Sequence, residues 1–356
     1  MSEANQTEKR GLMERLEDGP VVCAGGYLFE MERRGYLQAG TFVPEVVLEH
    51  PEVLAQLHRE FIRAGSDVLE AFTYYAHREK LRIIGKEDLL EPMNREAIRI
   101  AKSVAAESGG EQLLVAGNIC NTNAYDPNDP SSVKHVRGMF EEMVGWAVEE
   151  GVDFILAETL YYHREARIAL DVIRESGLPS VVTLGLPADG KLLDGVSAAE
   201  AARRLEDNGA DVVGLNCYRG PATMLPALRE VREAVSCHVA ALPVTYRTTP
   251  EHPTFFNIPD EKCPCELPGG RPFPTALDPL HCNRYEISEF TSQAHAMGVN
   301  FLGICCGNAP HYTRSMAEAL GRRPPASKYS PDMSKHIMFG TDGSLKKHIR
   351  DSAGKF

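Results

Sequence analysis

The chain has 356 residues, 43% of them hydrophobic and 25% charged, which is typical of a soluble globular protein with a large core. A formal net charge of −12 argues against binding to nucleic acid or to an anionic membrane, because phosphate groups are bound by clustered Lys and Arg. No stretch approaches the roughly 20 apolar residues of a membrane span, and residues 1–19 are polar, so we expect a cytoplasmic protein.

Four amphipathic stretches of the chain end at a glycine and are each followed by an apolar run. The glycines are Gly65, Gly151, Gly209 and Gly298. A glycine at this point is typical of the end of a helix, because it adopts the left-handed conformation without steric cost. The pattern predicts a repeated unit in which a helix leads into a buried strand.

Eight short apolar runs are predicted to be strands. Their apolar residues are continuous, which is typical of parallel strands covered on both faces. In chain order the runs are 20–26, 67–72, 113–119, 154–160, 180–186, 211–217, 238–244 and 301–306. Eight strands alternating with helices predict an α/β fold, a closed (β/α)8 TIM barrel over residues 1–326, with a doubly wound open sheet as the alternative. No glycine-rich nucleotide-binding motif follows a strand, which weakens a nucleotide-binding version of that sheet.

Catalytic groups of such a barrel are expected at the C-terminal ends of its strands. The residues at these ends are Gly25, Gly26, Phe72, Thr73, Asn118, Cys120, Glu158, Gly185, Asn216, Cys217, Cys305 and Cys306. Cys217 follows the sixth run, and the Cys305–Cys306 pair follows the eighth. Only one strand of a closed barrel separates these positions, so the three thiols can converge.

Three converging thiols suit Zn²⁺, which thiolates bind at about 2.3 Å and which keeps a fourth position open in catalytic sites. The nine cysteines of a chain without a secretion signal are expected to be free thiols, metal ligands or nucleophiles. A disulfide between Cys305 and Cys306 is disfavoured, because the short backbone between them would strain it. The alternative is that the thiols only fill the core, since free Cys is among the most buried residue types.

Five segments together resemble the homocysteine S-methyltransferase family, most closely its betaine-dependent members. They are AGGYLFEMERRGYLQAG (24–40), LHREFIRAGSDVLEAFTYYA (57–76), FILAET (154–159), GLNC (214–217) and GICCG (303–307). The resemblance extends from about residue 20 to 327. It implies a zinc-bearing barrel that moves a methyl group from a small-molecule donor to the thiol of homocysteine, giving methionine. Its zinc ligands correspond to Cys217, Cys305 and Cys306.

The resemblance also implies roles for substrate-binding residues. Glu158 matches the carboxylate that holds the amino group of homocysteine, and Tyr75 matches an aromatic ring of the donor pocket, so both are expected to be catalytic. Gly25 and Gly26 match a backbone turn that lies against the amino-acid part of the substrate. The donor is expected to be an ammonium or sulfonium cation, which leaves as a neutral amine or sulfide and which aromatic faces attract by about 0.5–2 kcal/mol each.

The chain departs from the family at positions that contact substrates. Ala24 stands where the family usually has an acidic residue that helps to bind the amine, and Glu30 or Glu32 are the residues considered as replacements. Phe42 stands where the betaine enzymes carry Trp, and Thr159 where they carry Tyr. The donor pocket therefore has fewer strong aromatic faces. Glycine betaine, a sulfonium such as dimethylsulfoniopropionate or S-methylmethionine, or another N-methyl compound all remain as donors.

Alternative functions stay open at this point. The chain could be the methyltransferase component of a corrinoid system, act on a different thiol acceptor, or be a zinc-stabilised barrel that binds a betaine or an amino acid. Cys263 and Cys265 lie in a Pro- and Gly-rich loop and are interpreted as incidental thiols. Residues 327–356 form a short polar extension, with the hypothesis that they join subunits of a homo-oligomer. Sedimentation as a monomer would contradict that hypothesis.

Overall fold

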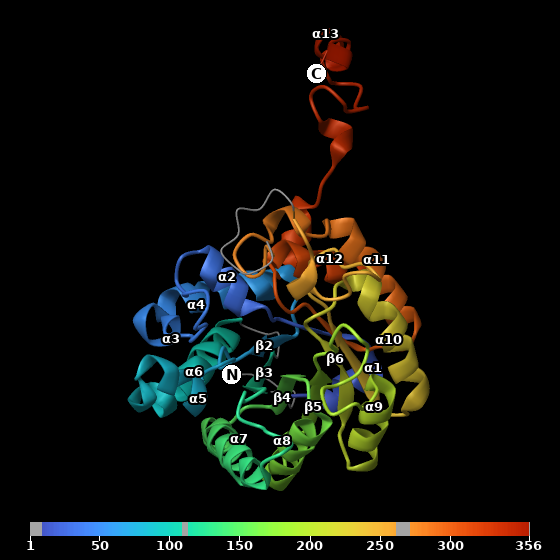
Figure 1. Cartoon of the computed structure of the whole chain (residues 1–356). Helices are drawn as coiled ribbons and strands as arrows, with labels where there is room; N and C mark the ends of the chain where they lie inside the picture. The colour runs from blue at the N-terminus through green and yellow to red at the C-terminus, as the bar shows by residue number, and fades with distance from the viewer. Residues whose placement is uncertain (1–8, 109–112, 261–270, 356) are drawn as a thin grey trace, which may run out of the picture.

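A closed barrel of eight parallel strands forms the centre of the protein (Figure 1). The computed structural model describes residues 9–108, 113–260 and 271–355, and Cys263 and Cys265 lie outside these ranges. The strands are hydrogen-bonded in chain order, and β1 pairs with β8 to close the barrel. They are β1 Val21–Cys23, β2 Val68–Glu70, β3 Leu114–Cys120, β4 Phe154–Leu160, β5 Ser180–Leu184, β6 Val212–Asn216, β7 His238–Leu242 and β8 Phe301–Gly303. The predicted (β/α)8 fold is confirmed, and each strand falls on one of the eight predicted apolar runs.

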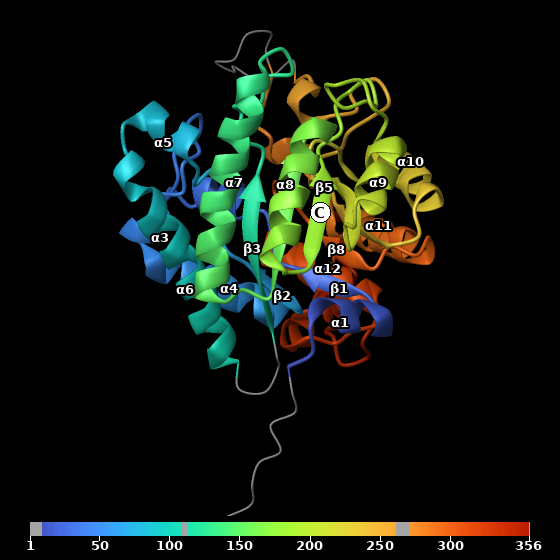
Figure 2. The same ribbon diagram turned by 90° about the horizontal axis from the view of Figure 1, so that it is seen from below.

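Helices cover the outside of the barrel, as Figure 2 shows for α7 and α8. The α-helices are α1 Leu12–Asp18, α2 Tyr27–Arg33, α3 Val46–Glu49, α4 Pro51–Ala64, α5 Arg78–Ile84, α6 Leu90–Glu107, α7 Pro130–Glu150, α8 His163–Ser176, α9 Ala198–Asp207, α10 Pro221–Ala234, α11 Arg284–Ala296, α12 Pro310–Ala319 and α13 Lys347–Arg350. Short 3₁₀ turns are η1 Glu87–Leu89, η2 Phe255–Asn257, η3 Asp278–Leu280, η4 Pro325–Tyr329, η5 Met333–Lys335 and η6 Ala353–Lys355.

The four predicted helix-ending glycines are all in the left-handed region. Gly65 and Gly151 are the C-caps of α4 and α7, with φ of 104° and 70°. The left-handed residue after α9 is Gly209, with φ of 87°, and the one after α11 is Gly298, with φ of 86°. Each lies one position beyond the C-cap of its helix. The helix-then-strand unit is therefore confirmed, because each of these glycines turns the chain toward the next strand.

The barrel interior is packed at the end where the strands begin and irregular at the end where they finish. Phe154 and Phe301, the first residues of β4 and β8, come from opposite sides of the barrel and meet edge to face, with ring centroids 6.1 Å apart. The pairing of β4 with β5 shifts register between Ala157 and Leu160, where Thr159 has φ of 58°. Such irregularities re-aim side chains, and this one lies beside Glu158.

The C-terminal tail extends away from the barrel (Figure 1). Four of its large apolar side chains, Tyr329, Met333, Ile337 and Phe339, are exposed. The predicted division into a barrel of residues 1–326 and a tail that contacts another subunit stays a prediction. Within the described ranges, no helix is both long and apolar enough to cross a membrane.

The close approach of β6 to β7 gives a prediction for stability. A Cβ at Gly214 of β6 would collide with the backbone of Ala240 on β7. We expect Gly214→Ala to lower the free energy of unfolding by about 1–3 kcal/mol, the usual cost of overpacking. The matched control is Gly138→Ala in α7, where nothing lies within 4 Å of a new Cβ and where we expect a gain of about 0.5–1 kcal/mol. Urea unfolding of the two variants measures both changes, and equal stabilities would contradict the prediction.

Candidate active site

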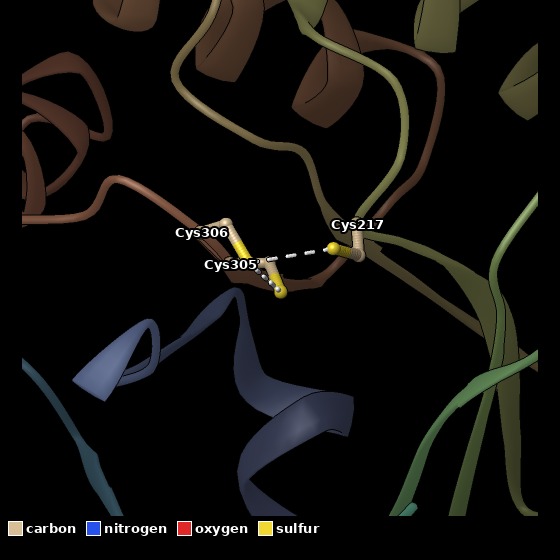
Figure 3. A group of neighbouring side chains, drawn as sticks. All are labelled: Cys217, Cys305 and Cys306. Atoms are coloured by element: carbon tan, nitrogen blue, oxygen red, sulfur yellow. Dashed lines mark hydrogen bonds between the residues drawn. The ribbon is translucent and has the colours of Figure 1, made fainter. Parts of the chain in front are cut away.

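Three thiols lie together at the C-terminal end of the barrel (Figure 3). Cys217 follows β6, and Cys305 and Cys306 follow β8. The Sγ atoms of Cys217 and Cys306 are 3.6 Å apart, those of Cys305 and Cys306 are 3.9 Å apart, and all three lie within 4.8 Å of one another. The convergence that the barrel topology predicts is therefore present in the structure.

The donor set and its spacing fit a tetrahedral metal. Thiolates at about 2.3 Å from a tetrahedral Zn²⁺ would be about 3.8 Å from one another, close to the two measured distances. Cys217 and Cys305 are buried, whereas Cys306 is partly exposed. Burial raises the pKa of Cys217, but hydrogen bonds from the Cys305 and Cys306 thiols outweigh it and lower that pKa to about 5. Among the described residues, no further His, Cys, Asp or Glu joins the cluster, so a fourth ligand position would be open.

The loops that carry the thiols are both hydrogen-bonded through their backbones to the C-terminal end of β7. The N–H of Cys217, whose φ is 56°, donates to the carbonyl of Leu242 at 2.9 Å. The N–H of Cys305 donates to the carbonyl of Pro243, also at 2.9 Å. A Cβ at Gly26 would collide with the carbonyl of Cys305. Glycine is therefore required at position 26, where the turn after β1 contacts the backbone of the loop that carries Cys305.

Two buried carboxyl groups lie at the same end of the barrel. Glu158 is near the end of β4, and Glu70 is the last residue of β2. The side-chain nitrogen of Asn118 donates to Oε1 of both carboxyl groups, at 2.8 Å each, and that of Asn216 donates to Oε2 of Glu158 at 2.9 Å. Burial and the charge on Cys305 raise the pKa of Glu158 to about 8. Burial and the charge on Glu158 raise the pKa of Glu70 well above its usual range.

A small cavity joins the carboxyl groups to the thiols. Its lining residues are Gly26, Tyr27, Leu28, Glu70, Phe72, Tyr74, Glu158, Cys305 and Cys306. Glu70 was not among the predicted site residues, although a Glu inside a run predicted to be buried on both faces was a usable signal. Glu30 and Glu32, the residues suggested as replacements for an acidic residue at position 24, do not line this cavity, and Glu30 forms ion pairs with Arg33 and Arg34.

The residues expected in a donor pocket come from three segments: the loop before α3, the loop after β2, and β4. Tyr75 has φ of 64°, its ring is 4.4 Å from that of Tyr74, and the Lys80 ammonium lies 4.0 Å from its centroid. Phe42 packs against Phe29, with centroids 5.9 Å apart. Thr159 is buried, and it donates its N–H to Oδ1 of Asn216 at 2.7 Å. Thr159 thus supports the carboxylate network through Asn216.

Tyr218, which directly follows Cys217, and Tyr161, which directly follows β4, were not among the predicted site residues. Tyr218 follows Cys217 directly, has φ of 56°, and stacks on Tyr161 with centroids 6.4 Å apart. Phe256 meets Tyr218 edge to face at 4.8 Å. All three rings are partly exposed. The positions of Tyr161 and Tyr218 directly after the fourth and sixth predicted strands were visible in the sequence, but the stacking of the two rings depends on loop conformation.

Comparison with known proteins adds independent findings. The model of the homocysteine S-methyltransferase family matches residues 21–320. The chain is 36% identical over 354 residues to betaine–homocysteine S-methyltransferase 1 of Xenopus tropicalis, covering 96% of this chain and 82% of the relative. It is 33% identical over 359 residues to the S-methylmethionine–homocysteine S-methyltransferase BHMT2 of Rattus norvegicus, covering 97% and 91%. The metallated form of the Escherichia coli homocysteine methyltransferase MmuM has the same fold, with a TM-score of 0.68 and 18% identity over 86% of this chain and 99% of that chain.

Metal binding is expected to depend on the three clustered thiols. With Zn²⁺ as the probe metal, Cys217→Ala should weaken binding by more than about 100-fold, because even the loss of a residue that only supports a ligand costs 10–100-fold. The control is Cys237→Ala, which removes a thiol near the start of β7, at the opposite end of the barrel. Chelator competition measures the affinities, and circular dichroism checks the fold. Unchanged affinity in Cys217→Ala would rule out this metal site.

Proposed function

The chain belongs to the homocysteine S-methyltransferase family, and from this premise we propose that its three clustered thiols hold Zn²⁺. It is a methyltransferase that acts on homocysteine. The observation that carries the zinc proposal is the adjacency of a three-thiol cluster to a cavity lined by two carboxyl groups. When bound, Zn²⁺ acts as a Lewis acid that lowers the pKa of a thiol that coordinates it. The pKa of a free thiol is about 8.5.

The residues around the thiols are proposed to bind and orient the acceptor. Glu158 lies where it can hold the amino group of homocysteine, while the sulfur points toward Cys217, Cys305 and Cys306. Asn118 and Asn216 donate hydrogen bonds to Glu158 and keep its carboxylate in one orientation. Burial of this group keeps water from competing for the amine. Gly26 lines the same cavity and allows the turn after β1 to lie against the thiol-bearing loop.

The reaction forms one bond and breaks one bond. The electron pair of the homocysteine thiolate forms the S–CH₃ bond of methionine. The bond between the methyl carbon and the donor nitrogen or sulfur breaks, and the donor leaves as a neutral amine or sulfide. The donor must therefore be a cation, because it then leaves as a neutral molecule. The acceptor must be a thiolate when it attacks the methyl carbon.

The aromatic rings at the mouth of the barrel are proposed to bind the cationic donor. Tyr218 directly follows Cys217 in the chain, and its ring stacks on that of Tyr161. Tyr75 remains a proposed member of this pocket. Aromatic faces attract quaternary ammonium and sulfonium groups alike, so glycine betaine and S-methylmethionine both suit this chemistry. The cytoplasm is the proposed location, since reduced thiols persist there.

Turnover by the purified chain tests the proposed function. The zinc-loaded chain with homocysteine and, in separate reactions, glycine betaine, dimethylsulfoniopropionate, S-methylmethionine or S-adenosylmethionine should produce methionine from at least one donor, as measured by mass spectrometry. Removal of the metal with a chelator should abolish turnover, and added Zn²⁺ should restore it. Full activity in the metal-free chain would overturn the zinc proposal. Absence of methionine from every donor would point to a corrinoid partner or to another acceptor.

Loss of the proposed donor-binding rings should affect the donor selectively. Tyr218→Leu and Tyr161→Leu are each expected to raise the KM for the donor by about 2–30-fold, because each ring contributes about 0.5–2 kcal/mol. The KM for homocysteine should change little. The control is Tyr285→Leu, since Tyr285 is 69% exposed on α11. Steady-state kinetics with each substrate varied in turn separates the two effects, and equal changes in both KM values would contradict the assignment.

A further inference from the structure

Glu70 is a buried carboxyl group that the proposed mechanism has not yet used. It faces the cavity that also contains Glu158, Cys305 and Cys306. We propose that Glu70 is the second carboxylate of the amine site, so that the α-ammonium group of the acceptor is bound between Glu70 and Glu158. This inference rests on the proposed function, in which Glu158 holds the amine, and it makes the acceptor an α-amino acid thiol specifically.

The geometry already contains one nitrogen that bridges the two carboxyl groups. The side-chain nitrogen of Asn118 lies 2.8 Å from an oxygen of Glu70 and 2.8 Å from an oxygen of Glu158. The two groups are therefore close enough for a second nitrogen to contact both. Oδ1 of Asn118 is buried and, among the described residues, accepts no hydrogen bond. An ammonium group has three N–H donors, and the carboxyl groups of Glu70 and Glu158, which line the cavity, offer it acceptor oxygens.

Space for an ammonium group exists beside Glu70. A Cβ at Gly25 would lie 3.3 Å from Oε2 of Glu70, so glycine at this position leaves the carboxylate accessible. The free volume of the cavity is about 30 Å³. A water molecule needs about 10–15 Å³ by the same measure, so the cavity accommodates a compact group such as –NH₃⁺.

The charges of the site favour a cation at this point. Glu70 and Glu158 are buried side by side, where two unpaired negative charges would be costly. A cation between them compensates both charges and also faces Cys305 and Cys306, which line the same cavity. A plain alkyl thiol lacks that cation and leaves the two carboxyl groups uncompensated, so the pair selects for an amino group on the acceptor.

The test compares acceptors with and without an amino group. In the full-length, zinc-loaded chain, Glu70→Gln should raise the KM for homocysteine by about 10–100-fold, since a hydrogen bond to a charged group is lost. The KM for 4-mercaptobutyrate, which has the same chain and carboxylate but no amino group, should stay within about twofold. Glu70→Asp, which keeps the charge, should lie between the wild-type chain and Glu70→Gln.

The control is Glu165→Gln. Glu165 is also buried at this end of the barrel, but it accepts hydrogen bonds from Thr122 and does not line the cavity. Zinc content and circular dichroism show whether each variant is folded. An unchanged homocysteine KM in folded Glu70→Gln, or an equal rise for both acceptors, would overturn the role of Glu70. Failure of the wild-type chain to methylate homocysteine would instead overturn the proposed function, so the two failures are distinguishable.

Discussion

Pairing of the strands in chain order is the constraint on which the site depends. Because β7 pairs with both β6 and β8, the ends of β6 and β8 are one strand apart, and the thiols that follow them meet. Because β3 pairs with both β2 and β4, the carboxyl groups of Glu70 and Glu158 lie within hydrogen-bonding distance of Asn118 on β3. In an open sheet β1 and β8 would be apart. The turn at Gly25 and Gly26, which follows β1, would then lose its contact with the loop that carries Cys305 and Cys306. The thiol cluster and the pair of carboxyl groups are thus consequences of the strand order, and the contact between the turn after β1 and the thiol-bearing loop is a consequence of closure.

Several features of the site lower the stability of the fold, and the packing of the rest of the barrel offsets this cost. Tyr75, Thr159, Cys217 and Tyr218 all have positive φ without being glycines, and backbone conformations of this kind cost of order 1–3 kcal/mol each. Two carboxyl groups and three thiols share one buried end of the barrel. A well-packed interior, with Phe154 against Phe301 across the lumen, supports this arrangement. Bound cations relieve part of the cost, which is why a metal ion, an ammonium group and an onium donor all suit the same end of the barrel.

The proposed roles of the residues differ between the two substrates. In the proposal, the acceptor amine is bound by buried carboxyl groups that Asn118 and Asn216 hold in place, so its selection depends on fixed charges. The proposed donor site is formed by the partly exposed rings of Tyr161 and Tyr218, because aromatic faces attract ammonium and sulfonium cations alike. The two relatives are named for different donors, betaine and S-methylmethionine, and for the same acceptor, homocysteine.

The sequence by itself determined the fold and the meeting of the thiols, because both follow from local signals: continuous apolar runs, helix-ending glycines, and cysteines just after two strands that both pair with β7. Tertiary structure alone decided that Glu70 rather than Glu30 faces Glu158, and that Tyr218 stacks on Tyr161 while Phe42 packs on Phe29. These pairings depend on strand register and on left-handed loop residues. A shift of one residue turns a side chain to the other face of a strand, and no local pattern specifies that shift.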